Sequence, residues 1–278
     1  MPAFARKRWG QHWLRDPRAL EQIAAAAELS GRDTVLEIGP GTGALTQYLL
    51  ARAGFVVAVE IDRERCQQLA RTLSAWRNWV LLPGDIRTLD LPAELAERGL
   101  ARPNKVAANI PYNITSPILQ ALLGRIAQPA AAYETVVLLV QQAIAERLCA
   151  RPGSRTYGAL SVRIQYLAEC ESIGRVPARA FSPAPQVDSA IVRLRPRPFE
   201  PQPRDPARLE QAITLGFANR RKMLRNNLKP LTATQAPARV LARSGIDPQA
   251  RAEALSVRDW IALSDRLDAL AANRAASS

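Results

Sequence analysis

A glycine-rich segment over residues 35–43 is the strongest chemical signal in the sequence. It reads Val-Leu-Glu-Ile-Gly-Pro-Gly-Thr-Gly, so a short apolar run leads into glycines at alternate positions, beginning with Gly39. Glycines there allow positive φ angles and let the backbone approach a ligand at the start of the following helix. The alternatives for this loop are a dinucleotide site, an S-adenosylmethionine site, or a tight strand–helix turn without a ligand.

Two acidic residues follow the next two predicted strands. Glu60 comes 21 residues after Gly39, where a carboxylate suits the two hydroxyls of a ribose. Asp85, in Gly-Asp-Ile, follows the third strand and is placed to accept from an exocyclic amine such as that of adenine. We expect both carboxylates beside the glycine loop.

The turn Asn109-Ile110-Pro111-Tyr112 follows the fourth predicted strand. A hydride-transferring enzyme needs a proton-handling side chain near its nicotinamide, commonly His, Lys or Tyr. This turn supplies an amide oxygen, a backbone carbonyl and an aromatic face instead. It favours S-adenosylmethionine over a dinucleotide, with a plain proline turn and a surface tyrosine as the alternative.

Together these motifs resemble the class I S-adenosylmethionine-dependent methyltransferases that modify adenine N6, and most closely the small-subunit (16S) rRNA adenine N6,N6-dimethyltransferase family. Further segments resemble that family's motifs in the right order: residues 7–14, 156–161, 181–189 and 217–222. The likeness therefore covers nearly the whole chain. The resemblance implies dimethylation of two adjacent adenines near the 3′ end of 16S rRNA, in a 30S subunit or precursor. It also implies a role in 30S assembly and action as a monomer.

Adenine N6 is a poor nucleophile, because its lone pair is delocalised into the ring. Two acceptors aimed at its N–H bonds, the side-chain oxygen of Asn109 and the carbonyl of Ile110, can localise that pair. Asn109 lies at the end of the fourth predicted strand, between the methyl donor and the base, so we also predict it as a cofactor-binding residue. Pro111 restricts Ile110 to extended geometry, and Tyr112 offers a stacking face for a flipped base. By resemblance Phe181 closes on the other face of the base; the alternative is a packed loop anchor.

The N-terminal motif contributes two predicted cofactor-binding residues, His12 and Leu14. His12 is the only histidine, and it stands where the family usually has asparagine, while Trp9 and Trp13 stand where phenylalanine is common. We interpret His12 as a cofactor-side hydrogen-bonding residue, the alternative being a surface or packed histidine. One histidine and three scattered cysteines exclude most metal sites and Ser-His or Cys-His catalysis, so we predict no metal.

These residues require a sheet to hold them together. Strands are predicted over residues 34–38, 55–60, 80–82, 105–108 and 135–140, with helices over 44–53, 63–76, 117–125 and 141–150. Two later strands are expected over 161–168 and 189–195. This alternation predicts an α/β fold, a Rossmann-like doubly wound class I methyltransferase sheet.

A small all-α domain is expected to follow the sheet. Five prolines within residues 195–206 predict a semi-rigid linker, and residues 207–270 show only helical periodicity, enough for three or four helices. We therefore predict a methyltransferase domain over residues 1–198 and a helical RNA-binding domain over residues 199–278.

The charge balance points to a polyanionic partner. There are 38 basic and 25 acidic residues, a net charge of +13, which suits nucleic acid or an anionic membrane surface. The densest patch comprises Arg220, Arg221, Lys222 and Arg225, without an acidic residue from Gln211 to Pro230. Its spacing is helical, so we expect some of these cations to share a face and contact RNA, with a solvated helix face as the alternative.

The sequence predicts a reduced, cytoplasmic protein that does not enter a membrane. The longest apolar strand-like run is short of the roughly 18 residues needed to span a bilayer. The basic N-terminus has no apolar signal region, because residues 9–17 interrupt it.

Three other functions compete with this interpretation. A large-subunit rRNA adenine methyltransferase that confers macrolide resistance shares the catalytic turn, but Lys-Arg-Trp-Gly-Gln and Asn-Arg-Arg-Lys favour the small subunit. A non-enzymatic RNA-binding assembly or transcription factor on this fold is disfavoured, because Glu60, Asp85 and Asn109 are intact. An NAD-dependent oxidoreductase is the most distant alternative.

Overall fold

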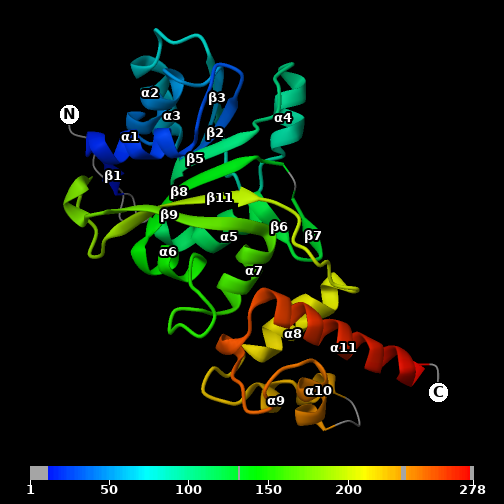
Figure 1. The fold of residues 1–278 in the computed structure, drawn as a ribbon. Coiled ribbons are helices and arrows are strands. Elements are labelled where there is room, and N and C mark those ends of the chain that lie inside the picture. Colours follow the sequence, from blue (N-terminus) through cyan, green and yellow to red (C-terminus); the bar gives the residue numbers. More distant parts are fainter. Residues whose placement is uncertain (1–11, 131, 233–235, 276–278) are drawn as a thin grey trace. The chain divides into compact units, whose positions relative to one another are not determined.

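The computed structural model describes residues 12–130, 132–232 and 236–275 (Figure 1). Residues 7–11 of the predicted N-terminal motif lie outside the described residues. The chain divides into two compact units, each built from several segments. The first comprises residues 1–124, 130–145 and 170–196, and the second comprises residues 125–129, 146–169 and 197–278.

The first unit contains a seven-stranded sheet in the order β4-β3-β2-β5-β8-β11-β9. The strands in that order are Trp79–Pro83, Phe55–Glu60, Thr34–Ile38, Lys105–Asn109, Thr135–Gln141, Ser189–Pro196 and Ala168–Val176. Strands β4, β3, β2, β5 and β8 run parallel, and β11 pairs antiparallel with β8. The predicted α/β sheet is confirmed.

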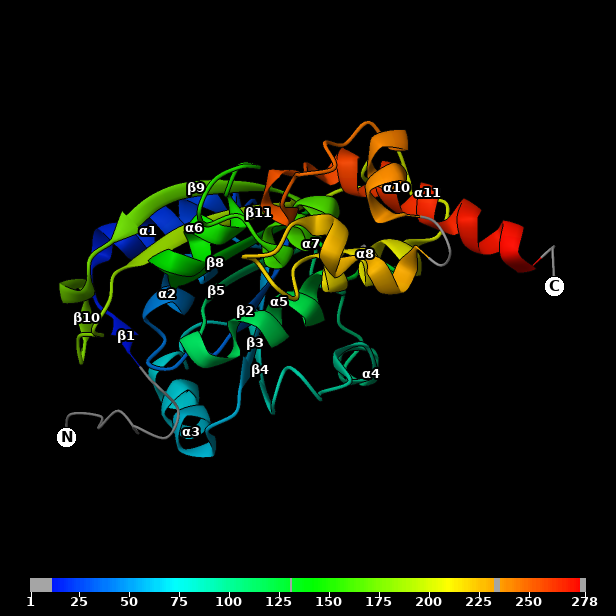
Figure 2. The ribbon, with the colours of Figure 1, turned by 90° about the horizontal axis from the view of Figure 1, so that it is seen from below.

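Helices cover both faces of this sheet (Figures 1 and 2). On one face lie α1 (Pro17–Ala26), α2 (Ala44–Leu50) and α3 (Arg63–Thr72), and on the other lies α5 (Thr115–Leu123). Since neither face meets water, the central strands are mostly apolar, as in β8, where Val136–Val140 are fully buried. Two further helices are α4 (Leu91–Glu97) and α6 (Gln142–Leu148).

Aspartates start the helices that flank the site. The carboxylate of Asp16 accepts from the backbone N–H groups of Arg18 (2.8 Å) and Ala19 (3.2 Å), which fixes the start of α1. Asp62 does the same for α3, accepting from the N–H of Glu64 at 2.9 Å. Each cap fixes where the chain turns away from the carboxyl edge of the sheet.

A two-stranded ribbon joins the N-terminal segment to a distant part of the sequence. Strand β1 (Trp13–Leu14) pairs antiparallel with β10 (Phe181–Ser182), with Leu14 opposite Phe181. This pairing was not predicted from the sequence. The pairing places Leu14 of the N-terminal motif beside Phe181, the predicted base-stacking residue.

The strand predicted over residues 161–168 is wrong. These residues form most of helix α7 (Ala159–Leu167), and strand β9 starts only at Ala168. Val162, Ile164 and Tyr166 alternate along the sequence, which resembles the period of a strand. All three are buried in the helix.

Polar residues of α7 are held by main-chain carbonyls, so the helix is buried on more than one side. Ser161 Oγ donates to the carbonyl of Arg147 at 2.6 Å and accepts from the N–H of Gly158 at 3.0 Å. Gln165 Nε2 donates to the carbonyls of Leu148 (2.9 Å) and Ala150 (2.8 Å). Arg147, Leu148 and Ala150 precede the helix, so the hydrophobic pattern of residues 161–168 alone does not reveal these contacts.

The second unit is helical, as predicted for the C-terminal part of the chain. Its helices include α7, α8 (Pro206–Gly216), α9 (Leu224–Asn227), α10 (Pro237–Arg243) and α11 (Val257–Ala275). Residues 146–169 belong to this unit, although the sequence analysis assigned them to the first domain. The predicted boundary after residue 198 lies close to Arg197, where the chain enters the second unit for the last time.

The core of the second unit forms around Trp260, which is fully buried. Its ring packs against Phe217, with centroids 5.5 Å apart. Gly216 ends α8 at this contact, and a Cβ there would lie 2.3 Å from the indole. A side chain is therefore excluded at this position.

The proline-rich segment after β11 packs within the second unit. The N–H of Arg197 donates to the carbonyl of Leu167 at 3.1 Å. Phe199 stacks on Tyr166 at 5.8 Å, and Gln202 accepts from the Tyr166 hydroxyl at 2.8 Å. These contacts fix the course of the predicted linker.

The basic patch does not have the predicted helical arrangement. Arg220, Arg221 and Lys222 lie in the turn between α8 and α9, and only Arg225 is helical. The three turn residues are exposed, and Arg225 is half-buried. Arg220 also has a structural role, because its guanidinium donates to the carbonyls of Arg155 (3.0 Å) and Tyr157 (2.8 Å).

Within the described part of the chain, no helix has both the length and the apolar character needed to cross a membrane.

Candidate active site

A cavity of about 260 Å³ opens in the first unit, at the carboxyl ends of β2, β3, β4 and β5. Nine residues predicted from the sequence come from six separate segments. All nine line this cavity: His12, Leu14, Gly39, Glu60, Asp85, Asn109, Pro111, Tyr112 and Phe181. The parallel strands bring the segments from Gly39 to Tyr112 together because the carboxyl ends of these strands lie at one edge of the sheet. His12, Leu14 and Phe181 reach the cavity at the β1–β10 ribbon.

The glycine loop follows β2 with an unusual backbone. Gly39, Gly41 and Gly43 have φ angles of +67°, +58° and +78°, which side chains rarely adopt. A Cβ on Gly41 would lie 3.4 Å from the indole of Trp13. The loop therefore needs glycine for its conformation, and at Gly41 it also packs closely beneath Trp13.

Glu60 ends β3 with its carboxylate buried beside this loop, 3% exposed. The carboxylate accepts from the N–H of Gly41 at 3.1 Å and from the N–H of Asp62 at 2.9 Å. Burial raises the pKa of Glu60, and the two backbone donors oppose that change. Glu60 thus shapes the loop as well as offering an acceptor to a ligand.

Asp85 follows β4 and shares its carboxylate with Arg87. The guanidinium Nε of Arg87 donates to both carboxylate oxygens, at 2.9 and 3.0 Å, and the Arg87 N–H adds a further bond at 3.0 Å. These hydrogen bonds lower the pKa of Asp85, which therefore stays charged at neutral pH. Arg87 was not predicted as a partner from the sequence, and a ligand amine would share the carboxylate with it.

Glu37 is a cavity residue that sequence reasoning missed. It lies in β2 and is 2% exposed, and among the described residues its Oε2 has no hydrogen-bond partner. Burial, followed by the nearby charge of Glu60, raises the pKa of Glu37 to about 8. A charge-bearing residue in an otherwise apolar buried strand was the available signal.

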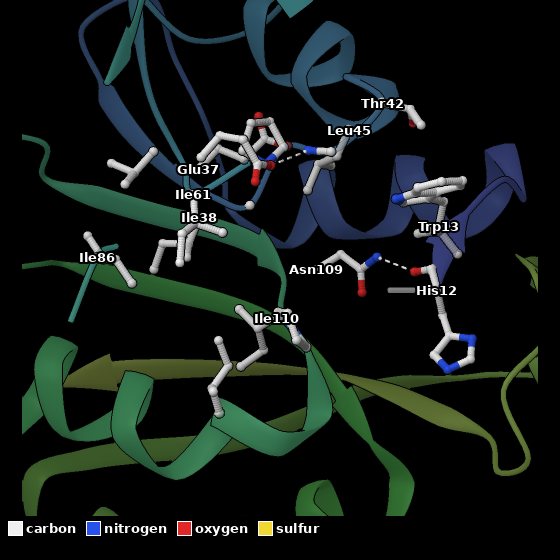
Figure 3. A pocket seen from close by; sticks show the side chains of 18 of the residues that line it. His12, Trp13, Glu37, Ile38, Thr42, Leu45, Ile61, Ile86, Asn109 and Ile110 are labelled. Atoms are coloured by element: carbon white, nitrogen blue, oxygen red, sulfur yellow. Dashed lines mark hydrogen bonds between the residues drawn. The ribbon is translucent and has the colours of Figure 1, made fainter. Parts of the chain in front are cut away.

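Asn109 ends β5 with its amide directed at the N-terminal segment (Figure 3). Its Nδ2 donates to the main-chain carbonyl of His12 at 3.3 Å. Because a carbonyl oxygen only accepts, this bond requires the amide nitrogen to face His12. The Asn109 oxygen is left for a donor from elsewhere.

Tyr112 lies in the short helix η2 (Tyr112–Ile114), directly after Pro111. Its hydroxyl forms a 2.7 Å hydrogen bond with Ser189 Oγ at the start of β11, and its ring stacks on His12 with centroids 5.9 Å apart. Ser189 is fully buried. Ser189 ends the motif over residues 181–189, and its hydrogen bond to Tyr112 was not predicted from the sequence.

The other wall of the cavity is formed around the β1–β10 ribbon. Phe181 is 5% exposed and belongs to the hydrophobic core cluster, so it both lines the cavity and anchors its loop. On the adjoining side, Arg65 of α3 lies over the indole of Trp13, 4.5 Å from the ring centroid. Arg65 was not predicted, since nothing in sequence connects it to Trp13.

The cavity suits a ligand with a nucleoside and a charged end. Carboxylates at Glu60 and Asp85 offer acceptors for hydroxyls and an amine, and Ile38, Ile61 and Ile86 add apolar surface (Figure 3). In the described part of the chain, no group of three or more His, Cys, Asp or Glu residues is arranged to hold a metal ion.

Comparison with known proteins identifies relatives along nearly the whole chain. The family described as ribosomal RNA adenine dimethylase matches residues 3–269. Ribosomal RNA small subunit methyltransferase A of Synechococcus elongatus is 55% identical over 261 residues, covering 93% of this chain and 94% of the relative. The same-named protein of Acaryochloris marina is 56% identical over 262 residues, covering 94% of this chain and 96% of the relative.

Solved structures agree with the fold. The crystal structure of 23S rRNA methyltransferase ErmE is 31% identical with a TM-score of 0.72, over 92% of this chain and 99% of that one. A dimethyladenosine transferase from Plasmodium falciparum is 24% identical with a TM-score of 0.74, over 91% and 96% of the two chains. Because the family match spans almost every described residue, the chain belongs to the ribosomal RNA adenine dimethylase family.

Proposed function

We propose that this protein dimethylates N6 of two adjacent adenines near the 3′ end of 16S rRNA, with S-adenosylmethionine as the methyl donor, during 30S assembly. The observation that carries the proposal is the amide of Asn109. Its nitrogen is engaged by the carbonyl of His12, and its oxygen is available within a cavity that Tyr112 and Phe181 also line.

Three carboxylates match the polar groups of the cofactor. Glu60 would accept from the ribose hydroxyls and Asp85 from the adenine amine. The unpartnered, buried Oε2 of Glu37 would accept from the methionine ammonium. The ammonium would then compensate the negative charge of Glu37, which is otherwise costly to bury. His12, Leu14 and Gly39 line the same cavity.

The chain's own residues activate the adenine by positioning. When bound, the cofactor supplies an electrophilic methyl group on a sulfonium. The Asn109 oxygen and the Ile110 carbonyl accept from the N6–H bonds and direct the lone pair out of the ring. Pro111, with φ −59° and ψ 136°, fixes the turn, and Tyr112 stacks on the flipped base. No side chain has to remove a proton before attack.

Identity to relatives favours the small ribosomal subunit. The relatives named for the small subunit are 52–56% identical to this chain, whereas 23S rRNA methyltransferase ErmE is 31% identical. Methylation of the large-subunit rRNA is the second candidate, because ErmE shares the fold over 92% of this chain.

The functional test is methyl transfer to isolated 30S subunits, followed by mapping of the modified nucleotides. We expect dimethylation of two adjacent adenines near the 3′ end of 16S rRNA. Modification of 50S subunits alone would favour the second candidate. A titration with S-adenosylmethionine and with NAD separates the enzyme classes, since only the first should bind.

The turn between α8 and α9 is proposed as an RNA contact. Arg221, Lys222 and Arg225 have no acidic neighbour in sequence, and holding such cations together costs self-repulsion that a phosphate backbone relieves. Arg220 contributes charge while it holds the loop at Arg155. The protein is proposed to act in the cytoplasm as a monomer.

Neutralising Arg221 and Lys222 together should weaken 30S binding and flatten its dependence on salt. The slope of log K against log salt should fall by about 0.7–0.9 for each phosphate that the variant no longer neutralises. Salt titrations of 30S binding by the wild type and the variant measure this slope. The control is the double variant Arg239→Gln with Arg243→Gln, at two exposed cations of α10. It lowers the net charge by the same amount as the Arg221/Lys222 variant. Equal slopes for the wild type and the Arg221/Lys222 variant would exclude this patch as an RNA contact.

Affinity for S-adenosylmethionine should rise with pH because of Glu37. Its carboxyl has a pKa of about 8 and is mostly protonated at neutral pH, and a bound ammonium favours the ionised form. Binding therefore releases a proton, and affinity should increase about tenfold from about pH 6 to about pH 7. Calorimetry in buffers of different ionisation enthalpy measures the proton release.

Glu37→Gln should bind more weakly and lose this pH dependence. Asp85→Asn is the matched control, because the pKa of Asp85 is lowered and its carboxyl does not titrate in this interval. It should bind more weakly and yet keep the proton release. If Glu37→Gln releases as many protons as the wild type, Glu37 is not the acceptor of the ammonium.

A further inference from the structure

His12 contacts three residues, in two distant segments, that the proposed mechanism needs in register. Its main-chain carbonyl accepts from Asn109, its imidazole Nδ1 is 2.8 Å from the carbonyl of Pro183, and its ring stacks on Tyr112. These partners are 97, 171 and 100 residues away in sequence. One residue therefore joins the catalytic turn, the loop after β10 and the N-terminal segment.

The carbonyl contact determines how the Asn109 amide is turned. An amide side chain can rotate to exchange its oxygen and nitrogen, and only one orientation presents an acceptor to an N6–H group. The His12 carbonyl accepts from Nδ2 at 3.3 Å, which selects the orientation with the oxygen toward the cavity (Figure 3). The acceptor is thus set before a base arrives.

The imidazole anchors that carbonyl. Since the Pro183 carbonyl can only accept, His12 Nδ1 carries the hydrogen and donates to it. Pro183 follows directly after β10, the strand that carries Phe181. The side chain therefore ties the N-terminal segment to the loop of one proposed stacking residue.

The imidazole ring also covers one side of the other proposed stacking residue. It lies at 24° to the ring of Tyr112, and the Tyr112 hydroxyl is held separately by Ser189 at 2.7 Å. With the hydroxyl fixed at one end and a ring packed on one side, Tyr112 has little freedom to tilt. In Figure 3 the imidazole extends away from the indole of Trp13, which packs on the glycine loop.

We infer that His12 is a positioning residue for the target adenine, acting through the Asn109 amide and the Tyr112 ring. The inference rests on the proposed function, and it differs from the cofactor-side role expected from sequence. Asparagine in its place could keep the donor to Pro183 but would have no ring to pack on Tyr112. This chain thus places an additional aromatic group at the adenine site.

The test separates the two contacts of the imidazole. His12→Asn keeps an N–H donor close to the position of Nδ1 and removes the ring, whereas His12→Phe keeps a ring and removes the donor. Each should lower kcat for 30S methylation about fivefold, and His12→Ala should lower it about tenfold or more. The KM for S-adenosylmethionine and the KM for 30S should stay within about twofold of the wild type, since positioning acts on the bound base.

Trp13→Leu, at the residue next to His12, is the contrasting variant. Its ring packs against Gly41, so this change should raise the KM for S-adenosylmethionine and leave kcat largely intact. If the His12 variants instead lose cofactor affinity in proportion to rate, or keep wild-type kcat, the inference is wrong while the proposed function stands. A wild-type protein that does not methylate 30S overturns the proposed function and this inference with it.

Discussion

Asn109→Ala should slow single-turnover methylation of 30S subunits by on the order of 10²-fold or more, as removal of an aimed polar group does in other enzymes. The substitution removes the acceptor proposed for adenine N6 and also the amide nitrogen that bonds to the His12 carbonyl at 3.3 Å. Affinity for S-adenosylmethionine should fall far less, because Glu60, Asp85 and the glycine loop are untouched.

The measurement is a rapid-quench assay with saturating protein and cofactor, combined with calorimetry of cofactor binding. Asn113→Ala is the matched control, because Asn113 is an exposed asparagine of the same turn that also lines the cavity. It should retain a near-normal rate. An Asn109→Ala protein with wild-type turnover would rule out the proposed acceptor geometry.

Local patterns were sufficient to predict the parts of the site that depend on strand ends. The strands predicted over residues 34–38 and 55–60 match β2 and β3, and parallel pairing then requires Gly39, Glu60 and Asp85 to lie at one edge. The residues that follow these strand ends line one cavity for that reason, whereas His12, Leu14 and Phe181 reach it at the β1–β10 ribbon. Their roles in binding and catalysis stay predictions.

Contacts between distant segments were not predictable from those patterns. The pairing of β1 with β10 and the packing of Arg65 on Trp13 join segments that come together only in the folded chain. The strand predicted over residues 161–168 was wrong for a related reason. Carbonyls of a preceding segment hold the polar residues of α7, and tertiary burial overrides the alternating pattern.

Charge was informative about the partner and misleading about local structure. The run from Arg220 to Arg225 was expected on one helix, yet its first three residues lie in a turn, because α8 ends at Gly216 against Trp260. Glu37 shows the opposite limitation. Its sequence position inside an apolar strand signalled burial, whereas its unpartnered oxygen is visible only in the structure.

Glu60→Ala should weaken S-adenosylmethionine binding at least tenfold, about 1.4 kcal/mol. Hydrogen bonds to charged groups contribute about 1.5–3 kcal/mol, and the 3% exposed carboxylate is shielded from water that could replace it. The substitution also leaves the N–H groups of Gly41 and Asp62 without their acceptor. Isothermal calorimetry measures the loss, and thermal unfolding of the ligand-free variant checks that the fold is retained.

Contact with the ribose and support of the glycine loop can be separated with a cofactor analogue. S-adenosylhomocysteine and its form without ribose hydroxyls should be compared on the wild type and on Glu60→Ala. If the carboxylate holds the ribose, the wild type should discriminate strongly against the deoxygenated analogue and the variant should bind both forms alike. If the variant loses the same factor for both ligands, Glu60 acts only through its bonds to Gly41 and Asp62. We expect the first outcome, because both backbone donors leave lone pairs on a carboxylate that lines the cavity.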